Sequence, residues 1–192
     1  MKVSAVLGSP RTSGNSATIT KTLLGVLASK GAQSKTFELN NLVYRGCQGC
    51  MSCKIKTEKC IVHDGLTEVL EDIRTSDVTV IASPVYVGEI SAQTKGLIDR
   101  FYSYYTPDFR TNPKPSRLAG ARKLVFILSQ GNPDETFFGD IISRYTRLLG
   151  RLGFEDIYPL RACGLGPDSN VLNNQKITDR ITEIATRLWA AS

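Results

Sequence analysis

Near its N-terminus the chain reads KVSAVLGSPRTSGNSATI (residues 2–19), an apolar run followed by a polar loop and an apolar-periodic segment. The run at 2–7 has the length and the Val and Ala content of a buried strand, and a helical stretch is expected over about 15–30. A strand that leads through a Gly- and Ser-rich loop into a helix is the first half of a β-α-β unit. This stretch therefore predicts an α/β fold.

The rest of the chain repeats this alternation. Because alternating strands and helices form a parallel sheet covered on both faces, we expect a doubly wound α/β fold. The first, third and fourth runs are nearly all apolar, as central strands are, whereas Pro159 places the fifth at an edge. The predicted order is 2-1-3-4-5 in one domain, 1–192, with a cysteine-rich insertion at about 45–63. Strands are expected at 2–7, 35–39, 77–83, 123–129 and 156–162, and helices at about 15–30, 65–76, 92–105, 135–151 and 174–190.

Composition narrows the class of protein. The 192 residues are 41% hydrophobic and 22% charged, and no apolar run approaches the roughly 20 residues that span a bilayer. The net charge of +6 comes from scattered Lys and Arg, which favours an anionic cofactor or an acidic partner over nucleic acid. The segment MKVSAVLGSPR lacks the longer apolar core of a signal peptide. We expect a cytoplasmic protein that binds neither membrane nor nucleic acid.

The loop after the first strand, GSPRTSGNSATI (8–19), has the composition of a phosphate site. Backbone N–H groups and the helix dipole point into such a loop, and its Ser and Thr hydroxyls and Arg11 add donors. Neither GxxxxGK[ST] nor GxGxxG is present, so a terminal monophosphate is favoured over a triphosphate or a dinucleotide. An alternative is that Ser13 or Asn15 caps the helix and Arg11 is merely solvated.

Two further loops should lie beside this one, because the carboxyl ends of neighbouring parallel strands share one edge of the sheet. SPVYVGEISAQTKGLIDRF (83–101) offers Tyr86 as a flat surface and Gly88 for close backbone approach. SQGNPDETFF (129–138) offers a turn at Gly131 and Asn132. Each loop alone fits a plain turn, but with the phosphate loop they predict a site for a heteroaromatic ring.

Taken together, GSPRTSGNS, SPVYVGEISAQTKGLIDRF and SQGNPDETFF resemble the NADPH-dependent FMN reductase family of the flavodoxin-like superfamily, over nearly the whole chain. The resemblance implies that FMN is bound by these loops. The implied phosphate contacts are Ser9, Arg11, Ser13, Asn15 and Ser16, and the implied ring contacts are Pro84, Val85, Tyr86, Val87, Gly88, Gln130, Gly131 and Asn132.

Four cysteines fall within fifteen residues, GCQGCMSCKIKTEKC (46–60), as CxxCxxCx6C. Four thiolates at compact spacing are the ligand set of an iron–sulfur cluster. The basic residues among them would lower thiol pKa values. Zinc, a CxxC dithiol or plain reduced thiols are alternatives. The candidate ligands are Cys47, Cys50, Cys53 and Cys60, whereas Cys163 is expected to be a small buried hydrophobe and His63 a loop residue.

The cysteine segment most resembles that of the iron–sulfur flavoproteins, a branch of the same family, which implies a 4Fe-4S cluster near the flavin. The resulting hypothesis is an FMN-dependent oxidoreductase in which no acid–base side chain is catalytic. Electrons would pass between an external donor, either NAD(P)H or ferredoxin, the cluster, FMN and a small-molecule acceptor, in a homodimer or homotetramer. A cluster-free NAD(P)H-dependent FMN, quinone or nitro reductase is one alternative. A flavodoxin-like electron carrier is another, although such carriers tend to be acidic.

The segment YSYYTPDFRTNPKPSRLAG (102–120) is irregular and rich in proline and aromatic residues. It fits either a surface loop or a lid or subunit contact. In the flavoprotein hypothesis, it is the segment expected to exclude water from the flavin.

Overall fold

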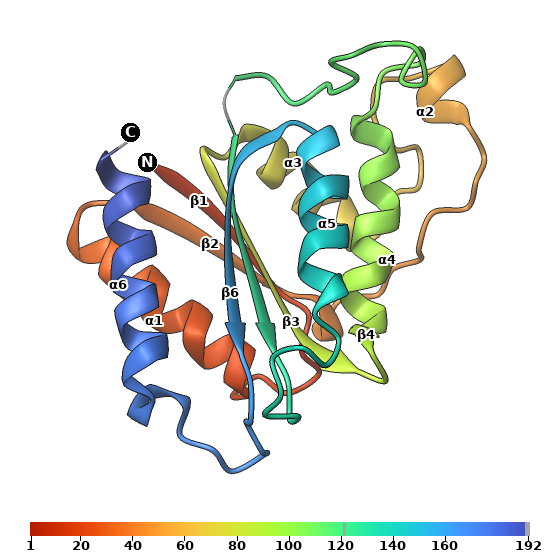
Figure 1. Cartoon of the computed structure of the whole chain (residues 1–192). Coiled ribbons are helices and arrows are strands. Elements are labelled where there is room, and N and C mark those ends of the chain that lie inside the picture. Colours follow the sequence, from red (N-terminus) through yellow and green to blue (C-terminus); the bar gives the residue numbers. More distant parts are fainter. Residues whose placement is uncertain (121, 191–192) are drawn as a thin grey trace.

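The computed structural model describes residues 1–120 and 122–190, which form a sheet flanked by helices (Figure 1). The strands are Lys2–Leu7 (β1), Gln33–Glu38 (β2), Val78–Tyr86 (β3), Glu89–Ile90 (β4), Arg122–Ser129 (β5) and Phe154–Ala162 (β6). The α-helices are Asn15–Ser29 (α1), Ser52–Ile55 (α2), Leu66–Thr75 (α3), Ala92–Arg100 (α4), Asp140–Arg151 (α5) and Gln175–Ala190 (α6). Short 3-10 helices cover Leu39–Asn41 (η1), Phe101–Tyr104 (η2) and Val171–Asn173 (η3).

The main strands lie in the order β2-β1-β3-β5-β6 and all pair in parallel. This confirms the predicted 2-1-3-4-5 order, which is that of flavodoxin-like folds. The strand that contains Pro159 lies at the edge, as expected for a residue that cannot donate to a ladder. The short β4 pairs antiparallel with the end of β3 and lies off the main path.

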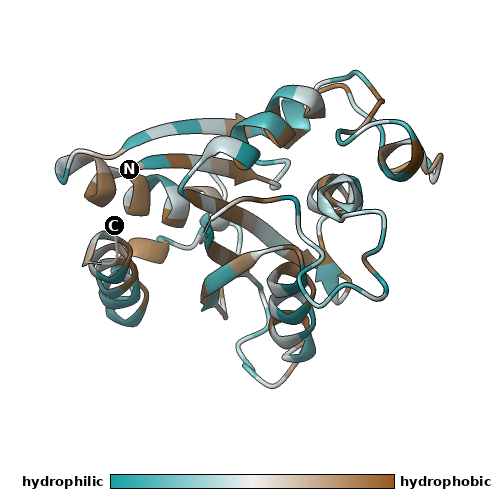
Figure 2. Ribbon diagram, turned by 90° about the horizontal axis from the view of Figure 1, so that it is seen from above, coloured by the Kyte–Doolittle hydropathy of each residue, from teal (hydrophilic) through white to brown (hydrophobic). Residues whose placement is uncertain are grey.

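Helices cover both faces of the sheet. Alternate residues of a strand point to opposite faces, so Val3, Ala5 and Leu7 pack with α1 and α6, whereas Val6 packs with α3, α4 and α5. In Figure 2, hydrophobic and hydrophilic segments alternate along the helices, as expected of helices that are apolar on one side. Among the described helices, none has both the length and the apolar character needed to cross a membrane.

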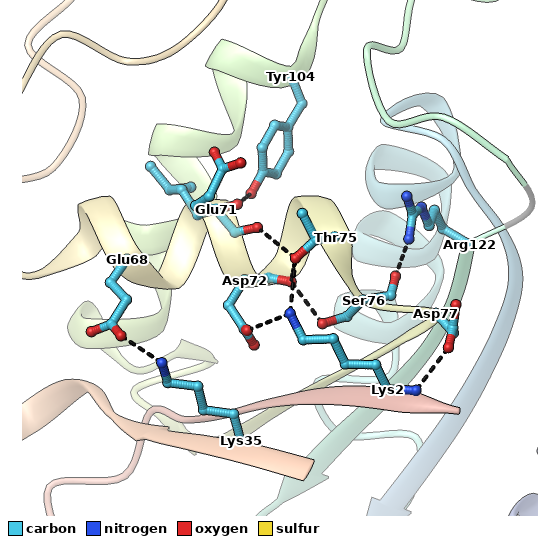
Figure 3. Close-up of polar contacts among 11 residues, drawn as sticks. Lys2, Lys35, Glu68, Glu71, Asp72, Thr75, Ser76, Asp77, Tyr104 and Arg122 are labelled. Atoms are coloured by element: carbon cyan, nitrogen blue, oxygen red, sulfur yellow. Dashed lines mark hydrogen bonds and ion pairs between the residues drawn. The ribbon is translucent and has the colours of Figure 1, made fainter. Parts of the chain in front are cut away.

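Polar contacts fasten α3 to the amino end of the sheet (Figure 3). The Lys2 ammonium lies 2.8 Å from the buried Asp72 carboxylate, and the Lys2 N–H donates to Asp77 Oδ2 at 2.7 Å. On the other side of α3, the Tyr104 hydroxyl donates to the Leu70 carbonyl at 2.7 Å. Burial raises the pKa of Tyr104 far above its ordinary value, so this hydroxyl stays a donor.

Three features differ from the predicted elements. The hairpin that forms β4 and the short α2 were not expected, and α5 begins at Asp140 instead of about 135. Before α5, the Asp134 carboxylate accepts bonds from the Thr136 N–H and hydroxyl, and Phe138 has a positive φ of 63°. These local bonds compete with a helix, which explains the later start.

Candidate functional site

The amino end of α1 is open to an anion. Its N-cap is Gly14, no side chain among the described residues caps its first N–H groups, and its first turn has no acidic residue. The alternative that Ser13 or Asn15 caps the helix is therefore wrong; the Asn15 amide instead donates to the Gly166 carbonyl at 3.0 Å. Arg11 is exposed, and no described residue forms an ion pair with it. Helix N–H groups without an intrahelical acceptor, beside a guanidinium without an ion-pair partner, attract a phosphate.

Buried hydroxyls fix the loop after β1 against the start of α4. The Ser91 hydroxyl donates to the Gly8 carbonyl at 2.7 Å and accepts from the Thr94 N–H at 3.2 Å, while Ser83 Oγ accepts from the Ser91 N–H at 2.9 Å. A Cβ on Gly8 would lie 1.8 Å from Thr94 Oγ1, so only glycine allows this approach. The loops after β1 and β3 thus form one unit.

The loop after β3 is a two-residue hairpin that presents apolar side chains to solvent. Val85 pairs with Ile90 and Tyr86 with Glu89, which leaves Val87 and Gly88 in the turn with φ of 50° and 78°. Positive φ at both positions is typical of a type I′ turn, but it is unfavourable for a β-branched residue such as Val87. Tyr86 is 41% exposed and Val87 is fully exposed, so both are available to a ligand.

The third loop is shaped from inside by Gln130. Its side chain is buried, with Nε2 donating to the carbonyls of Asn132 (2.9 Å) and Asp134 (3.1 Å), and Oε1 accepting from Arg161 Nη2 at 2.5 Å. The side chain of Gln130 therefore shapes the loop and has its polar atoms occupied within the protein. Gly131 is the exposed residue of the turn. The role of Arg161 was missed, because an arginine near the end of a predicted edge strand carries no signal for an internal contact.

The structure thus places the three predicted loops at the carboxyl edge of the sheet. The loop after β1 brings Ser9, Arg11, Ser13, Asn15 and Ser16, the hairpin brings Pro84, Val85, Tyr86, Val87 and Gly88, and the loop after β5 brings Gln130, Gly131 and Asn132. A Cβ on Gly88 would lie 2.9 Å from the Phe138 ring, so the second and third loops are also in contact.

The four clustered cysteines line one small cavity of about 20 Å³, together with Met51, Arg100 and Tyr102. Cys47 and Cys50 are exposed, Cys60 is half-buried and Cys53 is buried. In the part of the chain that the structure describes, no group of three or more His, Cys, Asp or Glu side chains is arranged to hold a metal ion. Cys163 lies apart from this cavity, and burial raises the pKa of its thiol.

Cations hold the cysteine segment in place through backbone carbonyls. Lys54 Nζ donates to the carbonyls of Tyr102 (2.6 Å) and Tyr105 (2.8 Å) and lies 3.5 Å from Cys53 Sγ. Arg117 Nη1 donates to the Cys53 carbonyl at 2.8 Å. Burial lowers the pKa of Lys54.

Two acidic groups of this region have lowered pKa values. Hydrogen bonds from the Ser52 N–H and hydroxyl lower the pKa of the Cys50 thiol, and the Arg100 charge acts in the same direction. Burial alone would raise the pKa of Asp64, but the Arg45 N–H and the Arg100 guanidinium outweigh it and lower the pKa. Both shifts favour negative charge near Arg100.

The cysteine cavity and the three loops lie at opposite ends of α4. Ser91, at the start of this helix, contacts the loop after β1, whereas Arg100, at its end, lines the cavity. Nine helical residues span about 14 Å. The segment 102–120 packs on the cysteine side, far from the strand tips (Figure 1). The expectation that it excludes water from a flavin is therefore wrong for a flavin bound within the same chain.

Comparisons with known proteins agree with this architecture. Residues 1–130 match the model of the family described as NADPH-dependent FMN reductase. An iron–sulfur flavoprotein of Methanocaldococcus jannaschii is 36% identical over 100 residues, which are 52% of this chain and 51% of that protein. An FMN-dependent NADH:quinone oxidoreductase of Pseudomonas putida is 32% identical over 133 residues, 65% of this chain and 62% of that protein.

The chain spans about half the length of the iron–sulfur flavoproteins that it matches. Among solved structures, an NAD(P)H:quinone oxidoreductase from Methanothermobacter marburgensis superposes with a TM-score of 0.72 at 18% identity, covering 98% of this chain and 95% of that one, which supports the fold. On the family match, which covers more than half of its residues, the chain belongs to the NADPH-dependent FMN reductase family.

Proposed function

We propose that the protein is an FMN-dependent oxidoreductase that binds the flavin at the carboxyl edge of its sheet. The observation that carries the proposal is the amino end of α1, which no described side chain caps, beside Arg11, which forms no ion pair within the described chain. An anion-binding end of this kind, next to two loops that offer exposed apolar and backbone groups, suits a ring with a phosphate tail. When bound, FMN supplies the transfer of hydride or single electrons.

Different residues would bind the phosphate and the ring of FMN. The first-turn N–H groups of α1, the exposed Ser13 and Arg11 would hold the phosphate, and Ser9 shapes the loop because its hydroxyl accepts from the Arg11 N–H at 3.1 Å. Tyr86 and Val87 would cover the ring, with backbone groups from Pro84 to Gly88 and at Gly131 beside it. These parts orient the flavin and exclude water on one side.

We further propose that Cys47, Cys50, Cys53 and Cys60 hold a 4Fe-4S cluster. The donor set fits, because all four thiols line one cavity beside a buried cation. A cluster of four irons and four sulfides would need more room than a cavity of about 20 Å³ offers. The cavity must widen for this, and no backbone hydrogen bond joins residues 47–50 to the rest of the described chain. The segment can therefore open without loss of a helix or strand.

For the whole reaction, we propose only the class of electron donor, the class of electron acceptor and the assembly. Electrons would come from NAD(P)H or a ferredoxin and pass to a small-molecule acceptor, in a homodimer or homotetramer. The name iron–sulfur flavoprotein, borne by several relatives, supports the cluster, whereas the quinone oxidoreductase of Pseudomonas putida supports a cluster-free reductase. Steady turnover with NAD(P)H in iron-free protein would favour the second candidate.

FMN titration of Arg11→Ala tests the phosphate site. Loss of a charge-assisted bond should weaken FMN binding by about 1.5 to 3 kcal/mol. Lys30→Ala removes the same charge at the other end of α1 and should bind FMN as the wild type does. Equal affinity of the wild type and Arg11→Ala would remove the phosphate role of this loop.

Anaerobic purification with iron, sulfide and flavin measured on one sample tests the cluster. Cys50→Ser should lose iron and sulfide but keep FMN, because the two sites lie at opposite ends of α4. Cys163→Ser, outside the cavity, should keep all three components. Iron-free wild-type protein that still binds FMN would contradict the cluster hypothesis and leave the cluster-free reductase hypothesis standing.

A further inference from the structure

Arg100, the last residue of α4, is a buried cation whose Nε atom has no hydrogen-bond partner among the described residues. Its side chain is fully buried and lines the cavity that the four cysteines share. Nη1 donates to the Arg45 carbonyl and to Asp64 Oδ2, both at 2.9 Å, and Nη2 donates to the Val62 carbonyl at 2.8 Å. Nε has no hydrogen-bond partner among the described residues.

A buried N–H without an acceptor is rare, because folding removes it from water without replacing the lost bond. The three N–H groups that donate hydrogen bonds hold both ends of the cysteine segment, at residues 45 and 62–64. The guanidinium therefore cannot turn without breaking these bonds. Of the two cavities that Arg100 lines, the one that it shares with all four cysteines is lined mainly by thiols and by apolar groups such as Met51. Of these, a sulfur that carries negative charge is the strongest acceptor for a guanidinium.

We propose that Arg100 is a positioning residue of the cysteine site, whose Nε–H donates a hydrogen bond to an anionic sulfur in the cavity and raises the reduction potential of the cluster. The inference rests on the proposed cluster and adds to it a residue that sets its electronics. Hydrogen bonds to sulfur and nearby charge are among the factors that set such potentials. A fixed cation stabilises the form that has gained an electron, so reduction becomes more favourable.

Arg117 provides a matched comparison. It also binds the cysteine segment, because its Nη1 donates to the carbonyls of Cys53, Glu58 and Ser103. It does not line the cavity, and its Nε is not among the unpartnered buried atoms. A change at Arg117 should therefore disturb the hold on the segment without removing a bond to sulfur.

The test is a redox titration of anaerobically reconstituted protein, followed by electron paramagnetic resonance. Arg100→Lys keeps the charge but loses Nε–H, and should make reduction at least tenfold less favourable, a fall of 59 mV in midpoint for one electron. Arg117→Lys should shift the midpoint by less than this. Equal midpoints for Arg100→Lys and the wild type, at equal iron content, would overturn the role of Arg100.

A second measurement needs no variant and serves if Arg100→Lys fails to fold. Reduced wild-type protein labelled with guanidino-15N arginine should show a 15N hyperfine coupling in electron–nuclear double resonance. A fully loaded cluster without this coupling overturns the inference alone. Wild-type protein that takes up no iron overturns the proposed cluster and this inference together, while FMN binding remains as a separate readout.

Discussion

The two ends of α4 are built by different means. At its start, the loops are held by the sheet itself, since the Gly8 N–H bonds to the Ala82 carbonyl at 2.8 Å and serine hydroxyls join the loops after β1 and β3. At its end, a long irregular segment is held by the side chains of Lys54, Arg100 and Arg117. Strand ends give a rigid position through repeated backbone bonds, whereas three cations, of which Arg100 is buried and the other two are partly buried, give a position that one substitution can remove.

The largest effect is expected at the cation-held end. Asp64→Asn leaves the buried Arg100 without its ion-pair partner and should lower the free energy of unfolding by about 3 kcal/mol. Urea-induced unfolding at neutral pH measures this loss. Asp99→Asn is the control, because its pair with Lys95 is exposed and should contribute less than about 1 kcal/mol. Equal losses in the two variants would contradict a buried role for this pair.

The same pair predicts a pH dependence. The pKa of Asp64 is lowered in the folded protein, so its contribution is present above the unfolded value of about 3.9 and is lost as the pH falls through the folded pKa. The stability difference between the wild type and Asp64→Asn should therefore be constant near neutral pH and shrink below about pH 4. A difference that stays constant into that acid range would show that the carboxylate charge is not the cause.

A smaller effect is expected at the sheet-held end. Gly8→Ala places a methyl group against Thr94 Oγ1 and should lower the free energy of unfolding by about 1 to 3 kcal/mol, with weaker FMN binding. Gly25→Ala is the control, since a Cβ there meets no atom of the described chain within 4 Å and Ala favours a helix. A Gly8→Ala protein as stable as Gly25→Ala would mean that the loop yields easily.

The smallest effect concerns the reactivity of Cys50. Ser52→Ala removes the side-chain hydrogen bond among those that lower the pKa of this thiol, so its alkylation by iodoacetamide should require a higher pH. The shift should be modest, because the backbone N–H of residue 52 remains. Peptide mapping by mass spectrometry follows each thiol, with Cys163 as the internal reference. An unchanged profile for Cys50 would assign its reactivity to the backbone alone.

Sequence patterns predicted the order of the main strands better than the short elements in the loops between them. Apolar runs, Pro159 and the GSPRTSGNS loop led to the correct strand order and to a family that the comparisons confirm. The hairpin at Val87 was missed because a β-branched residue is an unusual choice for a type I′ turn. The short α2 is four residues long, too short to leave a periodic signal.

The sequence by itself determined the α/β order, the polar Gly- and Ser-rich loop after the first strand and the close spacing of four cysteines, because these depend on local periodicity and residue chemistry. Tertiary structure alone decided that the cysteines gather at the far end of α4, that 102–120 packs beside them, and that Arg100 is buried with an Nε that no described residue accepts from. The reason is physical. Where a long irregular segment returns to the core depends on contacts between residues 36 to 64 positions apart, and no local pattern encodes them.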